Sequence, residues 1–308
     1  MADTERWVLG FDVGGSHVAA AVCRDGDFGL GTVVSAPHPE GETAEAFVDL
    51  LYRLSRDAGA DREPLEGAIL AVPGPFDLEA GVSRMQHKLP YLYGFDLRHA
   101  LSGRLGMDAG RVRFLNDANA YLLGEIGAGA ARGFARTIGL TLGTGIGSAF
   151  AVGGRIVTEG RGVPPDGEIW NLPYNGATVE DFVSTRAIAG AYQRSTGRSC
   201  AVVDIAWAAK CDAEARAAFE EFGRSLGRVI RTVLAEFEAD AIVLGGGIAR
   251  SAELFLDAAR GELPQGPLEL RIAELAERAP LVGCGVAWFA GCAAAIPAEP
   301  QSAGTIAD

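Results

Sequence analysis

The segment Asp12-Val13-Gly14-Gly15-Ser16 forms a glycine-rich turn directly after the apolar run 7–11. A strand that ends in a glycine-rich turn presents backbone N–H groups, which bind phosphate. Two similar turns follow apolar runs later in the chain, Gly143-Thr144-Gly145-Ile146-Gly147 and Gly245-Gly246-Gly247. Each of them alone is also explained as a tight turn of an α/β protein. The three together predict a nucleotide whose phosphates are held from separate sides, between two lobes.

Strands and helices alternate around these turns. Short apolar runs predict strands, and apolar residues at three- and four-residue steps predict helices with one buried face. Thr43 is the expected N-cap of the first helix. The predicted strands are 7–12, 19–23, 67–72, 113–115, 137–142, 149–152 and 241–244, and the predicted helices start at 44 and 117 and span 213–237 and 281–296.

This alternation predicts an α/β protein with two lobes around a central cleft. We expect a smaller N-terminal lobe over residues 1–117 and a larger one over 118–308, with the helix near 282–296 packing back on the first lobe. The runs that flank the second glycine turn repeat those that flank the first, which indicates a weak internal repeat. Ligands of open α/β folds bind at the carboxyl ends of the strands, where the glycine turns lie.

Composition favours a small-molecule ligand. The 308 residues include 40 Asp and Glu against 27 Lys and Arg, a net charge of −13, which argues against a nucleic-acid surface. The five cysteines form no CxxC pair, so neither disulfides nor a thiolate metal site is indicated. The N-terminus has no signal-peptide pattern, and 281–296 is too short to span a bilayer. We expect a cytoplasmic protein with no membrane association, and a homodimer is compatible with the apolar face of 213–237.

The motifs resemble the ROK family of sugar kinases and repressors, in the family's order over about residues 7–290. The resemblance implies an actin-like, hexokinase-like ATPase fold and phosphoryl transfer from ATP to a hexose. The segments that carry it are Asp12-Val-Gly-Gly-Ser-His17, Val72-Pro-Gly-Pro75, Leu115-Asn-Asp-Ala-Asn119, Leu142-Gly-Thr-Gly-Ile-Gly147, Gly167-Glu168, Val243-Leu-Gly-Gly-Gly-Ile248 and Pro280-Leu-Val-Gly283.

The chemistry of that reaction requires a carboxylate that accepts the hydroxyl proton, and Asp117 suits this role. It stands where a strand meets a helix, and the dipole of the helix N-terminus would help to keep it ionised. Taken alone, Asp117 would be interpreted as a helix cap, and the resemblance favours the general base instead. Asn116 is expected to position a sugar hydroxyl, unless it bonds only its own backbone. Asp12 is expected to orient Mg²⁺, through a bound water, near the β- and γ-phosphates.

 The bridging water is expected because magnesium keeps much of its own hydration shell in protein sites.

The glycine turns complete the expected nucleotide site. Gly14, Gly15 and Ser16 would form the first phosphate loop, and Thr144, Gly145 and Gly147 the second. Gly245, Gly246 and Gly247 would lie under the adenosine, where a Cβ would displace the base. The resemblance adds Gly74 to the substrate-binding residues. His17 is given no role.

Two glutamates match positions at which the family binds the sugar. Glu168 matches the family's Gly-Glu element, and Glu180 matches the glutamate before the next helix. Ionised carboxylates accept hydrogen bonds from sugar hydroxyls and so distinguish stereoisomers. Without the resemblance, each would be interpreted as a surface charge.

The chain departs from the family at its zinc site. The resemblance implies a histidine and a CxCGxxGC element, whereas this chain has Trp170 in the histidine's place and no cysteine between Cys23 and Cys200. Glu180 follows Glu168 by only 12 residues, so the zinc loop is excised. A tetrahedral zinc site needs four N or S ligands, and we predict no zinc. Trp170 is expected either to pack the loop or to stack on the sugar.

The sequence leaves the substrate open. D-glucose with ATP and Mg²⁺ is the first choice, with transfer to the 6-hydroxyl. The alternatives are an amino or N-acetyl hexose such as kanosamine, glucosamine or N-acetylmannosamine, and polyphosphate as the donor. A non-enzyme alternative is a catalytically silent sugar-binding module, against which the intact Asp117 and glycine turns argue. The chain reaches its first strand at Trp7, so no DNA-binding domain is expected before it.

Overall fold

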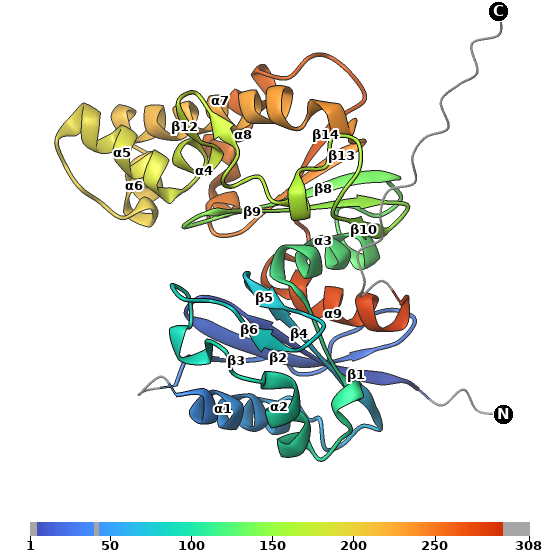
Figure 1. Cartoon of the computed structure of the whole chain (residues 1–308). Coiled ribbons are helices and arrows are strands. Elements are labelled where there is room, and N and C mark those ends of the chain that lie inside the picture. Colours follow the sequence, from blue (N-terminus) through green and yellow to red (C-terminus); the bar gives the residue numbers. More distant parts are fainter. Residues whose placement is uncertain (1–4, 40–42, 292–308) are drawn as a thin grey trace, which may run out of the picture. The chain divides into compact units, whose positions relative to one another are not determined.

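The computed structural model describes residues 5–39 and 43–291, which form two compact units (Figure 1). The first unit holds the chain up to Gly133 and the described part of the segment that starts at Ala273, and the second holds Phe134–Ile272. The sequence suggested a boundary after residue 117. The structure instead keeps helix α3 (Asp117–Ala128) in the first unit, because α3 packs along helix α9 (Ala279–Phe289).

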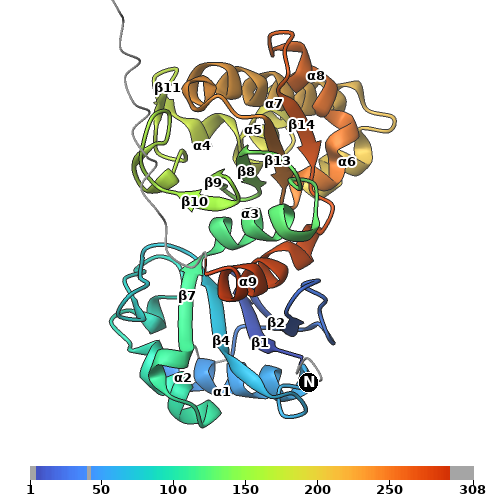
Figure 2. The same ribbon diagram turned by 90° about the vertical axis from the view of Figure 1, so that its right-hand side faces the viewer.

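The first unit is built on a five-stranded sheet in the order β3-β2-β1-β4-β7. The strands β1, β4 and β7 are parallel, and β2 and β3 extend the sheet with antiparallel pairing. Helices α1 and α2 cover one face, and α9 covers the other with α3 behind it (Figure 2). The bounds are β1 Trp7–Val13, β2 His17–Arg24, β3 Val34–Pro37, α1 Ala44–Asp57, β4 Leu65–Val72, β5 Phe76–Asp77, β6 Val82–Ser83, α2 Leu97–Leu105 and β7 Val112–Asn116.

The second unit repeats this topology. Its sheet has the order β10-β9-β8-β13-β14, in which β8, β13 and β14 are parallel and β9 and β10 are antiparallel additions. The internal repeat that the sequence indicates therefore extends to all five strands. The bounds are β8 Arg136–Leu142, β9 Ile146–Val152, β10 Arg155–Val157, β11 Pro173–Tyr174, β12 Ala177–Thr178, α4 Val179–Phe182, α5 Thr185–Thr196, α6 Val202–Ala208, α7 Ala213–Val233, β13 Ala241–Gly245, α8 Leu256–Gly261 and β14 Glu269–Ile272.

Apolar periodicity places the two long helices. The Thr43 side chain accepts a hydrogen bond from the backbone N–H of Ala46 and caps α1, whose apolar side buries Phe47 and Leu51 completely. Helix α7 ends at Val233 rather than at 237, and a short 3₁₀ turn follows it. The apolar face of α7 is buried in the core of its own unit, so this face is not available for a dimer interface.

Glycines let α3 and α9 approach closely. A Cβ on Gly283 of α9 would overlap the carbonyl of Ala120 on α3, and a Cβ on Gly124 of α3 would overlap the carbonyl of Ala279. Helix α9 is therefore the buried, tightly packed helix that its Gly- and Ala-rich sequence predicts. The predicted residues 292–296 lie outside the described residues. None of the helices described is both long and apolar enough to cross a membrane.

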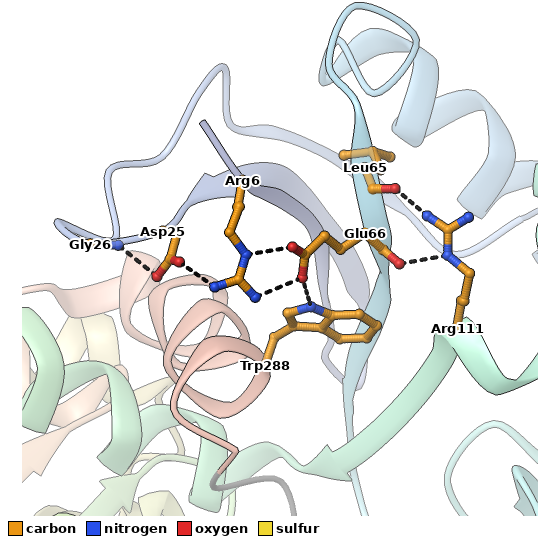
Figure 3. Close-up of polar contacts among 7 residues, drawn as sticks. All are labelled: Arg6, Asp25, Gly26, Leu65, Glu66, Arg111 and Trp288. Atoms are coloured by element: carbon orange, nitrogen blue, oxygen red, sulfur yellow. Dashed lines mark hydrogen bonds and ion pairs between the residues drawn. The ribbon is translucent and has the colours of Figure 1, made fainter. Parts of the chain in front are cut away.

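A polar network fixes α9 at the amino end of the sheet (Figure 3). The Trp288 indole N–H donates to Glu66 Oε2 over 3.0 Å, and Arg6 donates two hydrogen bonds to the same carboxylate, at 2.5 and 3.1 Å. These bonds lower the pKa of Glu66, with Arg6 as the larger cause. A Cβ on Gly67 would overlap the indole ring, so glycine is required beside it. The network holds α9 against β4, away from the carboxyl ends of the strands.

Candidate functional site

Three parallel strands of the first unit deliver the predicted residues to one sheet edge. Asp12 near the end of β1 pairs with Ala71 of β4, and Val72 at the end of β4 pairs with Asn116 of β7. The carboxyl ends of these strands therefore lie side by side, and this is the edge at which open α/β sheets bind their ligands. Asp12, the Gly74 loop and Asp117 lie at or just after these strand ends. The Gly74–Pro75 peptide in the loop is cis.

Asn116, not Asp117, caps helix α3. The Asn116 Oδ1 accepts hydrogen bonds from the backbone N–H groups of Ala118 and Asn119, at 2.9 and 3.2 Å. Asp117 is the first residue of the helix, and its Oδ1 accepts from its neighbour Ala118 over 2.8 Å. The cap that the sequence allowed for Asp117 is thus supplied by the preceding side chain. The Asn116 oxygen bonds its own backbone, so only its amide nitrogen suits the predicted contact with a sugar hydroxyl.

Asp12 lies in an environment that disfavours its charge. Burial, and then the neighbouring Asp117 carboxylate, raises the pKa of Asp12 to about 7. A divalent cation would compensate the charge at this position, and magnesium suits it because this ion binds few carboxylates and takes phosphate and water as its other ligands.

The first glycine turn is held by a residue that the sequence analysis did not single out. The Gly14 N–H donates to the His17 carbonyl over 2.9 Å and closes the turn between β1 and β2. His38, which follows β3, donates from Nε2 to the Gly14 carbonyl over 2.8 Å and from its backbone N–H to the Ser16 carbonyl over 3.2 Å. The Tyr91 hydroxyl lies 3.1 Å from His38 Nδ1. His17 itself is exposed, with Nδ1 3.0 Å from Ser16 Oγ.

The second and third glycine turns meet in the second unit. Gly245 at the end of β13 pairs with Thr141 of β8, so the two strands reach the same edge. Gly246 has a φ of +82°, and a Cβ there would lie 2.5 Å from the Leu142 carbonyl oxygen. Only glycine is compatible with both conditions. This unit therefore brings together the predicted residues Thr144, Gly145, Gly147, Gly245, Gly246 and Gly247 at the carboxyl ends of β8 and β13.

Glu180 lies against the second glycine turn. Its Oε2 accepts the backbone N–H of Ile146 over 3.3 Å, and a Cβ on Gly145 would overlap this carboxylate. Arg186, which the sequence analysis missed, donates to Glu180 Oε1 over 2.9 Å. Glu180 is thus paired with a cation while one side faces the turn predicted to bind phosphate.

Glu168 is held by the residues around it. Its neighbours Gly167 and Ile169 are both bonded to the buried Ser148 hydroxyl, at 2.6 and 3.1 Å. The Trp170 indole N–H donates to Glu168 Oε2 over 2.7 Å. Backbone and side chain of Glu168 are therefore each fixed by a specific partner.

No group of three or more His, Cys, Asp and Glu side chains that could bind a metal gathers within residues 5–39 and 43–291. The absence of zinc stays a prediction. Cys23 and Cys284 are buried, which raises the pKa of the Cys23 thiol to about 12 and that of Cys284 still further.

The comparisons with known proteins agree on a family. The model of the ROK family matches residues 8–288. An N-acetyl-D-glucosamine kinase of Salmonella paratyphi B is 27% identical over 290 residues, covering 88% of this chain and 93% of that protein. A ROK hexokinase of Thermus thermophilus is 28% identical with a TM-score of 0.75, over 91% of this chain and 97% of that one. A ROK family glucokinase of Streptomyces griseus, solved with glucose and AMPPNP, is 23% identical with a TM-score of 0.74, over 91% and 98%. These matches confirm the predicted α/β fold of the actin-like, hexokinase-like ATPase class.

Proposed function

Because the chain belongs to the ROK family, we propose that it is an ATP-dependent hexose kinase that phosphorylates the 6-hydroxyl of D-glucose. The observation that carries the proposal is the position of Asp117. It begins helix α3 at the sheet edge where Asp12 also lies, and Asn116 supplies the helix cap in its place. A carboxylate so placed at a helix N-terminus is suited to accept a proton from a hydroxyl.

The proposed roles follow the chemistry of phosphoryl transfer. Asp117 accepts the hydroxyl proton as the sugar oxygen bonds to the γ-phosphorus and the bond to the ADP oxygen breaks. Gly14, Gly15 and Ser16 and the Thr144, Gly145 and Gly147 loop bind phosphates, and Gly245–Gly247 accommodate the adenosine. Asp12 would hold Mg²⁺ through a water, and the bound ion would neutralise charge on the phosphates.

The sugar contacts come from the remaining predicted residues. Asn116, Glu168, Glu180 and the Gly74 loop bind hydroxyls, and the carboxylates read their orientation. Glu180 already pairs with Arg186, which favours an uncharged acceptor over the ammonium group of a 2-amino sugar. N-acetyl-D-glucosamine is the second candidate, because the curated relatives that match at 27% identity are N-acetyl-D-glucosamine kinases.

A coupled assay of ADP release over a panel of sugars tests the proposal. The panel includes D-glucose, D-mannose, N-acetyl-D-glucosamine, N-acetylmannosamine, glucosamine and kanosamine, and each sugar is offered with ATP and, by direct product detection, with polyphosphate. We expect sugar-dependent turnover with ATP and the highest kcat/KM for D-glucose. Higher kcat/KM for an N-acetyl sugar would reassign the acceptor. No sugar-dependent turnover with any donor would leave the silent binding module as the better account.

A further inference from the structure

The loop that joins Glu168 to Glu180 contains a hydrogen bond, from the Trp170 side chain to Glu168, that the sequence analysis did not predict. Trp170 lies between the short 3₁₀ turn Pro165–Gly167 and strand β11, and the residue is 45% exposed. A tryptophan so exposed contributes little to the core. Its indole N–H nevertheless has a definite partner, the Glu168 carboxylate at 2.7 Å. Hydrogen bonds to a charged acceptor at this distance are among the stronger ones in proteins.

The backbone of Trp170 joins the second glutamate to the first. The Trp170 carbonyl accepts the N–H of Glu180 over 3.1 Å, and the Leu172 carbonyl accepts the N–H of Val179 over 3.0 Å. The β11–β12 hairpin closes the loop between these bonds. Residues that are 12 positions apart in sequence are therefore bonded through one tryptophan, which contacts Glu168 by its side chain and Glu180 by its main chain.

We propose that Trp170 is a positioning residue that sets the orientation of the Glu168 carboxylate for an uncharged sugar. The inference rests on the proposed function, because it takes Glu168 as a ligand of sugar hydroxyls. With one oxygen occupied by the indole N–H, Glu168 presents its other oxygen, Oε1, to the hydroxyls. One hydrogen bond and one closed hairpin thus fix the sugar-binding loop. The loop then needs no metal ligand from this segment.

The surroundings separate this role from a merely structural one. The Glu168 backbone is anchored independently by Ser148, and Ile169 is fully buried in the core. Replacing the exposed indole by a phenyl ring removes the N–H donor but leaves these anchors and the main-chain bond to Glu180. Trp170→Phe is therefore expected to fold as the wild type does, while its Glu168 side chain gains rotational freedom.

The test compares Trp170→Phe with Trp207→Phe, a matched control at a residue of α6 that is 75% exposed. Steady-state kinetics are measured with sugar and ATP varied in turn, and thermal midpoints are recorded for each variant. We expect the KM for sugar to rise about 10-fold in Trp170→Phe, with the KM for ATP and the midpoint unchanged, and no change in the control. NMR of the tryptophan indole N–H groups gives a second readout, in which the Trp170 resonance is expected to shift in Glu168→Gln.

The outcomes are distinguishable. An active wild type whose sugar KM is the same in Trp170→Phe would overturn the positioning role and leave the kinase proposal intact. Equal rises in the KM for sugar and for ATP, or a lowered midpoint, would assign Trp170 a structural role instead. A wild type without sugar-dependent turnover would overturn the proposed function, and the role of Trp170 with it.

Discussion

His38 Nε2 donates a hydrogen bond to the Gly14 carbonyl over 2.8 Å, across 24 residues of sequence. A carbonyl only accepts, so the proton is on Nε2 and the Tyr91 hydroxyl faces Nδ1. The His38 ring also stacks on Phe47 of α1, with ring centroids 5.8 Å apart. The first glycine turn is thus tied to the core of its unit by an imidazole.

His38→Ala should therefore loosen the turn that binds phosphates in our account. Loss of one hydrogen bond of about 1 kcal/mol predicts a rise of about 5-fold in the KM for ATP. His38→Gln keeps an N–H donor and should retain part of the affinity. Steady-state kinetics with ATP varied check this, with the exposed His99→Ala as control. An unchanged KM for ATP in His38→Ala would argue against the role.

The stability of the metal-free protein should depend on pH through Asp12. Its pKa is raised to about 7 in the folded state, so the folded protein binds this proton more tightly than the unfolded chain does. The resulting stabilisation is full below about pH 4, the ordinary pKa of an aspartate, and is lost as the pH rises through about 7.

Asp12→Asn removes this titration. The variant should gain about 1–3 kcal/mol in free energy of unfolding relative to wild type between pH 5 and pH 8, a range that allows for solvent screening. Urea denaturation in buffer with a chelator measures it at both pH values. The same difference at pH 5 and at pH 8 would contradict the shifted pKa.

Glu125 is a buried carboxylate whose bonds hold two distant segments. It is fully buried on α3, and it accepts the N–H groups of Ala130, Glu274 and Leu275 at 2.8–3.1 Å. Glu125→Ala would leave one buried and two partly buried N–H donors without their acceptor and should cost about 3–5 kcal/mol. Chemical denaturation measures the loss, with the exposed Glu159→Ala as control. A loss no greater than that of the control would show that water satisfies the donors.

Local patterns predicted the parts of the fold that local physics determines. The Thr43 cap and the apolar stripes of α1 and α7 were predicted because capping and periodicity are encoded within a few residues. The site residues of each unit follow from strand ends, which glycine turns mark. The close approach of the ends of β8 and β13 also depends on Gly246, which has a left-handed backbone conformation. The sequence indicates this conformation only by the presence of a third glycine turn.

Tertiary partners could not be predicted in this way. Nothing near His38 indicates Gly14, and two of the three partners of Glu125 lie about 150 residues downstream. The boundary after residue 117 was misplaced for the same reason, because α3 belongs to the first unit through its packing on the much later α9. Arg186 was missed because a single arginine in a helix has no distinctive pattern.

The prediction of no zinc is tested on the intact protein. The loop that joins Glu168 to Glu180 contains no cysteine and no histidine, so it offers none of the N or S ligands that a structural zinc needs. Elemental analysis after purification in metal-free buffers should find far less than one zinc per chain, and dialysis against a chelator should leave the thermal midpoint unchanged. One zinc per chain that survives dialysis would contradict the prediction.

The most direct measurement is the identity and rate of the product made by the wild type and by Asp117→Asn. In ³¹P NMR, wild-type protein with D-glucose, ATP and Mg²⁺ should accumulate glucose 6-phosphate and ADP. Asp117→Asn should make the same product with kcat lowered about 10²–10⁴-fold, while calorimetry finds sugar binding nearly unchanged. A near-normal kcat in Asp117→Asn, or no sugar phosphate from the wild type with any hexose of the panel, would contradict the account.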